Sequence, residues 1–270
     1  MRKTIFLFLL HFSLYGSEVP DFKNINRSKN VVFFLSTPKS GTNLVSGSLS
    51  AITRKPISWL RWKMKIFNPS LEYTQDPSYN RLELPLVSDK PLMYRTHYDF
   101  EELMKVSSCW NKLIFLTRNP KELLFRKFFL ESSSTENPDI KFIENFLSGY
   151  LQAFKVFDGW FSENKCLVFY EDFISCGDEI LLDLLKFMDE EPNFIDDYQQ
   201  HKEEYTSKLL NSYAQQHTHN AGGSSSINGP KTIHYTKDVS FETLACIDEY
   251  IKTKEPLIWE KYLKRFQSFP

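Results

Sequence analysis

The fold is decided by the stretch Leu35-Ser36-Thr37-Pro38-Lys39-Ser40-Gly41-Thr42-Asn43-Leu44, which joins a buried strand to a helix through a short polar loop. The apolar run 31–35 precedes the loop, and the pattern of residues 44–49 predicts a helix. Backbone N–H groups at such a helix start attract an anion, the helix dipole favours its negative charge, and Lys39 adds a positive charge. The stretch therefore predicts a phosphate-binding loop.

The order of residues in this loop differs from that of a Walker A loop. The Walker A pattern, Gly-x-x-x-x-Gly-Lys-Ser/Thr, places a glycine directly before the lysine. Here Pro38 precedes Lys39, and the glycine follows two residues later. A P-loop nucleotide kinase is therefore an alternative for which the Walker A order is missing. Such a kinase would also need an acidic ligand for magnesium.

Composition and charge narrow the class of protein. The 270 residues can form one large domain or two small ones, and 41% are hydrophobic, which is ample for a packed core. The formal net charge of −1 gives no basic excess, so nucleic acid is not expected as a partner. Apolar runs alternate with helical patterns, which is typical of an α/β fold with a parallel sheet covered on both faces.

The same patterns predict individual elements. Strands are expected at 31–35, 92–94, 112–117 and 166–170. Helices are expected at 120–130, 139–161, 179–188, 193–216 and 241–266, with short helical pieces around 59–67. An aromatic stripe at helical spacing within 139–161 is more typical of a core than of a binding site. Its members are Phe142, Phe146, Tyr150, Phe154 and Phe157.

The N-terminal residues have features of a targeting segment. Two basic residues at positions 2 and 3 precede an apolar stretch over 4–15, which is too short for a bilayer span of about 20 residues and suits a signal peptide. The cleavage site is poor, so an apolar strand or helix of the mature fold is the alternative. We therefore expect residues 1–17 to be a signal peptide or apolar segment, residues 28–268 to form the folded domain, and no stable membrane span.

The four cysteines, Cys109, Cys166, Cys176 and Cys246, are scattered and include no Cys-x-x-Cys pair. This spacing favours buried or idle thiols over a zinc site. One disulfide is an alternative if the chain is exported.

Three further segments carry candidate chemistry. Residues 94–97 (Tyr-Arg-Thr-His) place His97 after a short strand, and a neutral imidazole accepts a proton readily near pH 7. Residues 116–122 (Leu-Thr-Arg-Asn-Pro-Lys-Glu) end a strand at Arg118, whose guanidinium can bind phosphate oxygens in fork geometry. Residues 167–172 (Leu-Val-Phe-Tyr-Glu-Asp) end with carboxylates, which we expect to orient a basic group or cap the next helix.

Taken in chain order, these segments resemble the motifs of the sulfotransferases that use 3′-phosphoadenosine 5′-phosphosulfate (PAPS). The likeness is specific from residue 31 to 172 and faint beyond. It implies a P-loop-like three-layer α/β/α fold with a central parallel sheet. It also implies an enzyme that transfers a sulfuryl group from PAPS to a hydroxyl or amine, with PAPS as co-substrate and no metal.

The resemblance assigns the first loop to the phosphosulfate. It implies that Lys39 contacts this group and its bridging oxygen, and so takes part in catalysis. It further implies hydrogen-bond donors for the same group, namely Ser40, Gly41, Thr42 and Asn43.

The resemblance also implies that His97 is the catalytic base and that Arg118 binds the 3′-phosphate. The family usually has a serine eight residues after that arginine, and this chain has Arg126. Arg126 either replaces a hydroxyl with a charged donor, giving a two-arginine clamp, or marks a pocket with poor nucleotide affinity. A late glycine-rich loop with Lys231 loosely matches the family's nucleotide-covering lid, and a plain surface loop is the alternative.

A protein that keeps this fold but has lost catalysis, and only binds a partner or nucleotide, is the alternative from another class. Arg126 supports it, as does Leu44 where the family has tryptophan. The joint presence of Lys39, His97 and Arg118 favours the enzyme.

The acceptor and the location stay open. Small molecules, sugars and lipids all remain as acceptors, and nothing indicates the oligomeric state. The aromatic residues between 59 and 79 either line the acceptor pocket, which would fit an apolar or sugar acceptor, or belong to the core. The signal-like start predicts a secretory or exported protein, whereas the cytosolic origin of PAPS favours the cytoplasm.

Overall fold

The computed structural model describes residues 31–65, 68–75, 82–88, 90–97, 103–104, 111–132, 138–218 and 239–267. Residues 1–17, the domain start at 28 and Lys231 lie outside this part, so the predictions made for them stay predictions. In chain order the elements are β1 Val32–Ser36, α3 Thr42–Thr53, β2 Ile57–Lys65, β3 Asn68–Gln75, β4 Met93–Thr96, β5 Lys112–Thr117, α6 Pro120–Ser132, α7 Ile140–Gly159, η1 Ser162–Asn164, β6 Lys165–Phe169, α8 Tyr170–Met188, α9 Ile195–Gln200, α10 Lys202–Thr218, α11 Phe241–Lys254, α12 Pro256–Ile258, η2 Trp259–Leu263 and η3 Lys264–Phe266.

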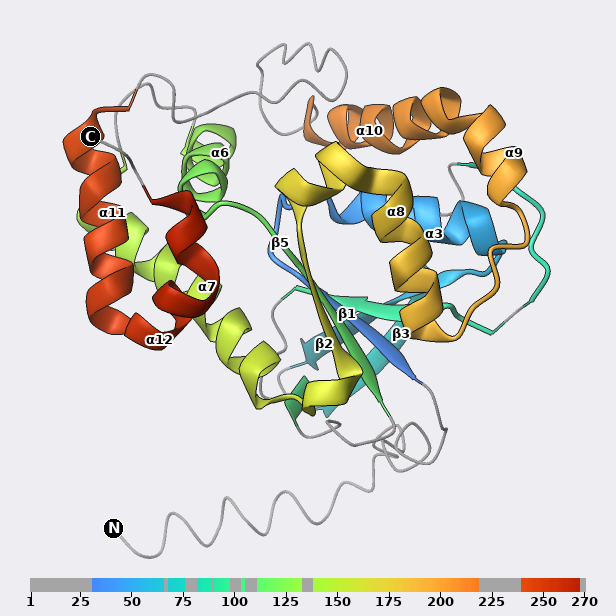
Figure 1. The fold of residues 1–270 in the computed structure, drawn as a ribbon, viewed down its shortest axis with the longest axis horizontal. Helices are drawn as coiled ribbons and strands as arrows, with labels where there is room; N and C mark the ends of the chain where they lie inside the picture. Colours follow the sequence, from blue (N-terminus) through green and yellow to red (C-terminus); the bar gives the residue numbers. More distant parts are fainter. Residues whose placement is uncertain are drawn as a thin grey trace, which may run out of the picture.

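Within the described residues, six strands form one sheet in the order β3-β2-β4-β1-β5-β6. β2, β4, β1, β5 and β6 run parallel, and β3 pairs with β2 in the antiparallel sense. Strand β1 therefore lies between β4 and β5, near the middle of the sheet (Figure 1). The predicted α/β class with a central parallel sheet is confirmed.

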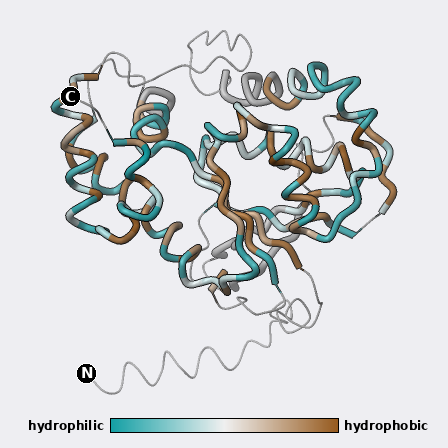
Figure 2. Tube along the Cα trace, in the orientation of Figure 1, coloured by the Kyte–Doolittle hydropathy of each residue, from teal (hydrophilic) through white to brown (hydrophobic). Residues whose placement is uncertain are grey.

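Alternate side chains of β1 enter two different cores. Phe33 and Leu35 pack with residues of α6, α7, α11 and α12, whereas Val32 and Phe34 pack with residues of α3, α8, α9 and α10. Figure 1 shows these two groups of helices on opposite sides of the strands, and Figure 2 shows that the central strands are the most hydrophobic part of the trace. This burial on both faces makes the three layers that the sequence predicted.

Residues 57–75 contradict the short helical pieces expected around 59–67. They form β2 and β3, which pair from Ser58 opposite Gln75 to Lys65 opposite Asn68. Residues 60–65 (Leu-Arg-Trp-Lys-Met-Lys) alternate strictly between apolar and charged, and this period of two favours a strand over a helix. Pro69 lies in the edge strand β3, where a proline is tolerated.

Helix α7 agrees with its sequence prediction at both ends. Asp139 precedes it, and its carboxylate accepts a hydrogen bond from the N–H of Phe142 at 2.7 Å, which caps the helix. Tyr150, Phe154 and Phe157 are buried in the core, so the aromatic stripe is structural as predicted.

Helix α8 begins earlier than the sequence predicted. It begins at Tyr170, directly after β6, and the backbone at Cys176 is non-helical. The helix expected at 179–188 is therefore the second half of a longer, kinked helix. Among the described helices, none is both long and apolar enough to cross a membrane.

The described cysteines behave as the spacing predicts. Cys166, Cys176 and Cys246 are free thiols, and Cys109 lies outside the described residues. Burial raises the pKa of the Cys166 thiol to about 11, and the nearby charge of Asp183 adds to this effect. The thiol of Cys166 therefore stays protonated and unreactive near neutral pH.

Candidate active site

The candidate segments gather at one edge of the sheet, where adjacent parallel strands end. The strand register brings the last residues of β4, β1, β5 and β6 to the same side. His97 follows β4, the predicted phosphate loop follows β1, Arg118 follows β5 and Tyr170 follows β6. Open α/β sheets bind their ligands at this carboxyl edge.

Two residues with positive φ shape the loop between β1 and α3. Lys39 has φ of 72° and Gly41 has φ of 90°; such a conformation is uncommon for lysine and is typical of residues at ligand sites. The N–H of Ser40 donates to the carbonyl of Thr37 at 3.2 Å, and the Ser40 hydroxyl donates to the same oxygen at 2.7 Å. Ser40 thus braces the turn, and its contact with a bound donor stays a prediction.

The N-terminus of α3 has no side-chain cap. Its N-cap residue is Gly41, and the first N–H groups of any helix, here including those of Thr42 and Asn43, have no acceptor within the helix. Their partial positive charge adds to the formal charge of Lys39. The start of α3 can therefore bind an anion.

His97 contacts the end of β1 directly. Its Nδ1 lies 3.0 Å from Oγ of Ser36 and 2.9 Å from the carbonyl oxygen of the same residue. The hydroxyl of Thr42 donates to Ser36 Oγ at 3.0 Å. The predicted base and the predicted phosphate loop are therefore joined through one residue.

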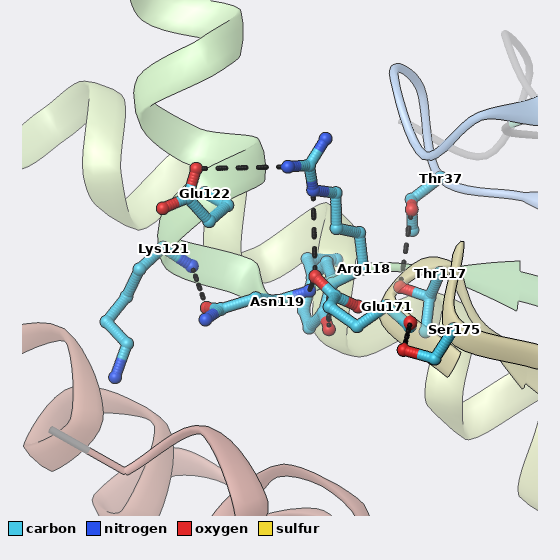
Figure 3. Close-up of polar contacts among 9 residues, drawn as sticks. Thr37, Thr117, Arg118, Asn119, Lys121, Glu122, Glu171 and Ser175 are labelled. Carbon is cyan, nitrogen blue, oxygen red and sulfur yellow. Dashed lines mark hydrogen bonds and ion pairs between the residues drawn. The ribbon is translucent and has the colours of Figure 1, made fainter. Parts of the chain in front are cut away.

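Arg118 is buried among acidic and aromatic side chains at the end of β5. It is 4% exposed. Its Nε lies 3.6 Å from Oε1 of Glu171, and its Nη2 lies 4.0 Å from Oε2 of Glu122 (Figure 3). The guanidinium also lies over the Tyr170 ring, 4.8 Å from its centre. The protein itself therefore supplies counter-charges for this arginine.

Glu171 supports the loop after β5 through two contacts. Its carboxylate accepts a hydrogen bond from the N–H of Asn119 at 3.1 Å and pairs with Arg118 (Figure 3). Burial raises the pKa of this carboxyl, because the Asn119 hydrogen bond and the Arg118 charge oppose the desolvation only in part. Glu171 thus orients a basic group, as the sequence predicted.

Lys121 lies in the first turn of α6 and points away from Arg118, toward the C-terminal helices (Figure 3). Its Nζ donates to both carboxylate oxygens of Asp248, at 2.8 and 3.1 Å, and to the carbonyl of Phe266. Arg265 makes a second link, from its Nη1 to Oδ2 of Asp172 at 2.9 Å. Residues 239–267 are therefore fastened to the strand ends that form the site.

Arg126 lies on α6, eight residues after Arg118. Burial raises the pKa of the Tyr170 phenol, and the positive charges of Arg118 and Arg126 oppose that rise. Both arginines therefore act electrostatically on the Tyr170 side chain.

A cavity of about 130 Å³ adjoins the start of α3 at Leu44. Phe173, Leu181 and Tyr198 give it apolar walls. Lys202 and Asp178, which pair at 2.6 Å, are its charged residues. The lining of the cavity is therefore largely apolar, with one ion pair.

Sequence reasoning missed Ser36, Tyr170 and Arg95 as members of this site. Arg95 is 2% exposed and donates to Oγ of Ser46 on α3 at 2.9 Å, one turn after the phosphate loop. The arginine directly after the strand predicted at 92–94 was the available signal. Ser36 and Tyr170 offered a weaker one, because each lies where a predicted strand ends.

Comparisons with known proteins support the fold. No family model matches the chain, and no curated protein sequence matches it. Among solved structures, mouse sulfotransferase SULT7A1 complexed with PAP (3′-phosphoadenosine 5′-phosphate) has a TM-score of 0.52 and 16% identity, covering 89% of this chain and 90% of the other. Retinol dehydratase in complex with retinol and PAP has a TM-score of 0.54 and 14% identity, covering 86% and 83%. Its complex with androsterone and PAP has a TM-score of 0.55 and 14% identity, covering 83% and 80%.

The chain therefore has the fold of the PAPS-dependent sulfotransferases. At these identities the likeness shows the fold alone, because one fold can carry several activities. The activity has to be argued from the residues at the carboxyl edge of the sheet.

Proposed function

We propose that the protein is an enzyme that transfers a sulfuryl group from PAPS to the hydroxyl or amine of a small-molecule, sugar or lipid acceptor. The observation that carries this proposal is the contact of His97 with Ser36, which sets a base beside an anion-binding helix start. The fold adds support, because the similar structures were crystallised with PAP, the product that PAPS leaves.

Each part of the donor has a matching part of the site in this proposal. The start of α3 and Lys39 bind the 5′-phosphosulfate through N–H groups and charge. Arg118 and Arg126 bind the 3′-phosphate, and the cavity beside Leu44 takes the adenine. PAPS supplies the sulfuryl group and a phosphate that leaves readily.

In this proposal each residue has a separate role in the transfer reaction. The acceptor oxygen or nitrogen bonds to sulfur while the bond between sulfur and the phosphate oxygen breaks in line. His97 takes the acceptor proton, and Lys39 stabilises the negative charge that develops on the leaving oxygen. The helix start and the arginines hold the donor in position for this attack.

Calorimetric titration of PAP into the full chain tests the donor site without knowledge of the acceptor. We expect micromolar binding that is lost in Lys39→Ala. Lys55→Ala is a matched control, because Lys55 lies just after the other end of α3 and pairs with Glu190, so PAP binding should be unchanged. Absence of binding to the folded wild-type protein would overturn the proposal.

Transfer of labelled sulfate from PAPS to retinol and androsterone, the ligands named in the similar structures, then tests the reaction. Loss of transfer with retained PAP binding in His97→Asn is the result expected of a base. A folded wild-type protein that binds PAP but transfers to no hydroxyl or amine in a broad panel would instead support the fold as a binding module. Arg126→Ser, which restores the family's residue, would then test whether Arg126 is the reason.

A further inference from the structure

Ser36 presents two oxygens to the same nitrogen of His97. The residue is fully buried at the end of β1. Its carbonyl oxygen lies 2.9 Å and its Oγ 3.0 Å from His97 Nδ1. One residue therefore contacts Nδ1 of the imidazole through two oxygens.

The carbonyl contact decides which nitrogen carries the proton. A carbonyl oxygen can only accept a hydrogen bond, and in a neutral imidazole one nitrogen donates while the other accepts. If Nδ1 lacked its proton, two lone pairs would face each other at 2.9 Å. The contact is favourable only when Nδ1 carries the proton, and the lone pair is then on Nε2.

The hydroxyl contact is compatible with the same tautomer. Thr42 donates to Ser36 Oγ at 3.0 Å, which fixes the position of that oxygen. A hydroxyl oxygen has two lone pairs, so one accepts from Thr42 and the other can accept from His97. The N–H of Nδ1 is then shared between the hydroxyl and the carbonyl of Ser36.

We propose that Ser36 is the positioning residue that holds His97 in the Nδ1–H tautomer and leaves Nε2 as the nitrogen that takes the acceptor proton. This role rests on the proposed sulfuryl transfer. When Nε2 gains a proton the ring becomes positive, and the hydrogen bonds from Nδ1–H to Ser36 become charge-assisted and stronger. Ser36 thus stabilises the charged form of the base without touching donor or acceptor, as supporting residues do for other histidines.

Nitrogen NMR of the full chain tests the tautomer without any acceptor. The protein is labelled with ¹⁵N-histidine, and His97→Asn identifies the His97 signals among those of the six histidines. In the neutral ring we expect a protonated Nδ1 and an unprotonated Nε2. A neutral His97 with the proton on Nε2 would overturn the proposal.

Substitution of Ser36 tests the hydroxyl. Ser36→Ala keeps the carbonyl and removes Oγ, so we expect a smaller share of the Nδ1–H tautomer and a kcat about 10-fold lower with the KM for PAPS unchanged. Ser36→Thr keeps a hydroxyl and should restore both the share of the Nδ1–H tautomer and the kcat. An unchanged tautomer in folded Ser36→Ala would show that Oγ has no positioning role.

Ser50→Ala is the matched control. Ser50 is fully buried, as Ser36 is, but it lies at the other end of α3, where its hydroxyl donates to the carbonyl of Lys55 at 2.6 Å. The Ser50→Ala protein should be less stable than the wild type, and its His97 signals should be unchanged. PAP titration of the same samples separates two failures: no PAP binding contradicts the proposed function, whereas a wrong tautomer with intact PAP binding contradicts only the role of Ser36.

Discussion

The two loops that we propose to bind anions, at the carboxyl edge of the sheet, are stabilised by different kinds of interaction. The loop between β1 and α3 is held by neutral groups: the hydroxyls of Ser36, Ser40 and Thr42 and the carbonyl of Thr37 make its internal hydrogen bonds. The loop between β5 and α6 is held by charges, because Arg118 lies between two carboxylates.

This difference predicts different responses to an anionic ligand. An anion at the first loop meets a helix start and a lysine, so substitutions there can only weaken binding. An anion at the second loop competes with the carboxylates for Arg118, so removal of a negative charge there can strengthen binding. Four substitutions test this contrast, in decreasing order of expected effect.

Lys121→Met should destabilise the fold by about 3–5 kcal/mol, because it leaves the buried carboxylate of Asp248 without its counter-charge. Chemical denaturation measures the change in the free energy of unfolding. The double variant Lys121→Met/Asp248→Leu should recover much of the loss, since it replaces the ion pair with apolar groups. A loss below about 1 kcal/mol, with PAP affinity reduced instead, would mean that Lys121 is a ligand rather than a structural contact.

Arg118→Ala should weaken PAP binding about 100-fold, since charge-assisted hydrogen bonds contribute roughly 1.5–3 kcal/mol each. Two carboxylates would also be left near the 3′-phosphate without a cation between them. Titration calorimetry measures the affinity. Lys155→Ala removes another cation from an ion pair, that with Glu255 on the surface, and should leave the affinity unchanged; an equal loss in both variants would contradict a specific role for Arg118.

Gly41→Ala should destabilise the protein by about 1–2 kcal/mol and weaken PAP binding about 10-fold. The φ of 90° disfavours any side chain, and the new Cβ would overlap carbons of the Tyr170 ring. Gly149→Ala is the matched control, because it lies in helix α7 with open space around it and should stabilise slightly. Thermal unfolding and PAP titration measure the two effects. Equal stability and equal PAP affinity of the two variants would argue against the positive φ of Gly41 in the loop between β1 and α3.

Glu171→Gln should bind PAP several-fold more tightly than the wild type at pH 7. Glutamine can still accept the hydrogen bond from Asn119 but no longer repels the anion. The fold raises the pKa of Glu171, so its stabilising contribution is complete below the ordinary value of 4.5 and is lost as the pH rises through the folded value.

The stability of Glu171→Gln relative to wild type should therefore rise as the pH rises from 4.5 to 7. Thermal unfolding at both pH values measures this difference. A stability gap that does not change with pH, or weaker PAP binding at pH 7, would show that Arg118 needs the negative charge of Glu171 more than the ligand does.

The central layer could be predicted because its strands are encoded locally. The runs at 31–35 and 113–116 are continuously apolar and are followed by polar residues, which suffices for buried parallel strands. The hairpin at 57–75 was misread because its tryptophans and isoleucine suit either class, and only the alternation over 60–65 separates them.

The lysine, histidine and arginine of the candidate site could be predicted, whereas the contacts that support them could not. Lys39, His97 and Arg118 follow strand ends, where topology alone brings them to one edge. The contact of Ser36 with His97 joins residues 61 positions apart, and that of Arg118 with Glu171 depends on the pairing of β5 with β6. No local pattern encodes such distances.

The contact between Lys121 and Asp248 also bears on how the chain is made. The two residues are 127 positions apart, so at a synthesis rate of about 5–20 residues per second Lys121 leaves the ribosome roughly 6–25 s before its partner does. During that interval the ammonium group has to stay in water, and α6 cannot settle into its final place. The contacts that fasten the C-terminal residues to α6 can therefore form only after residues 248–266 emerge.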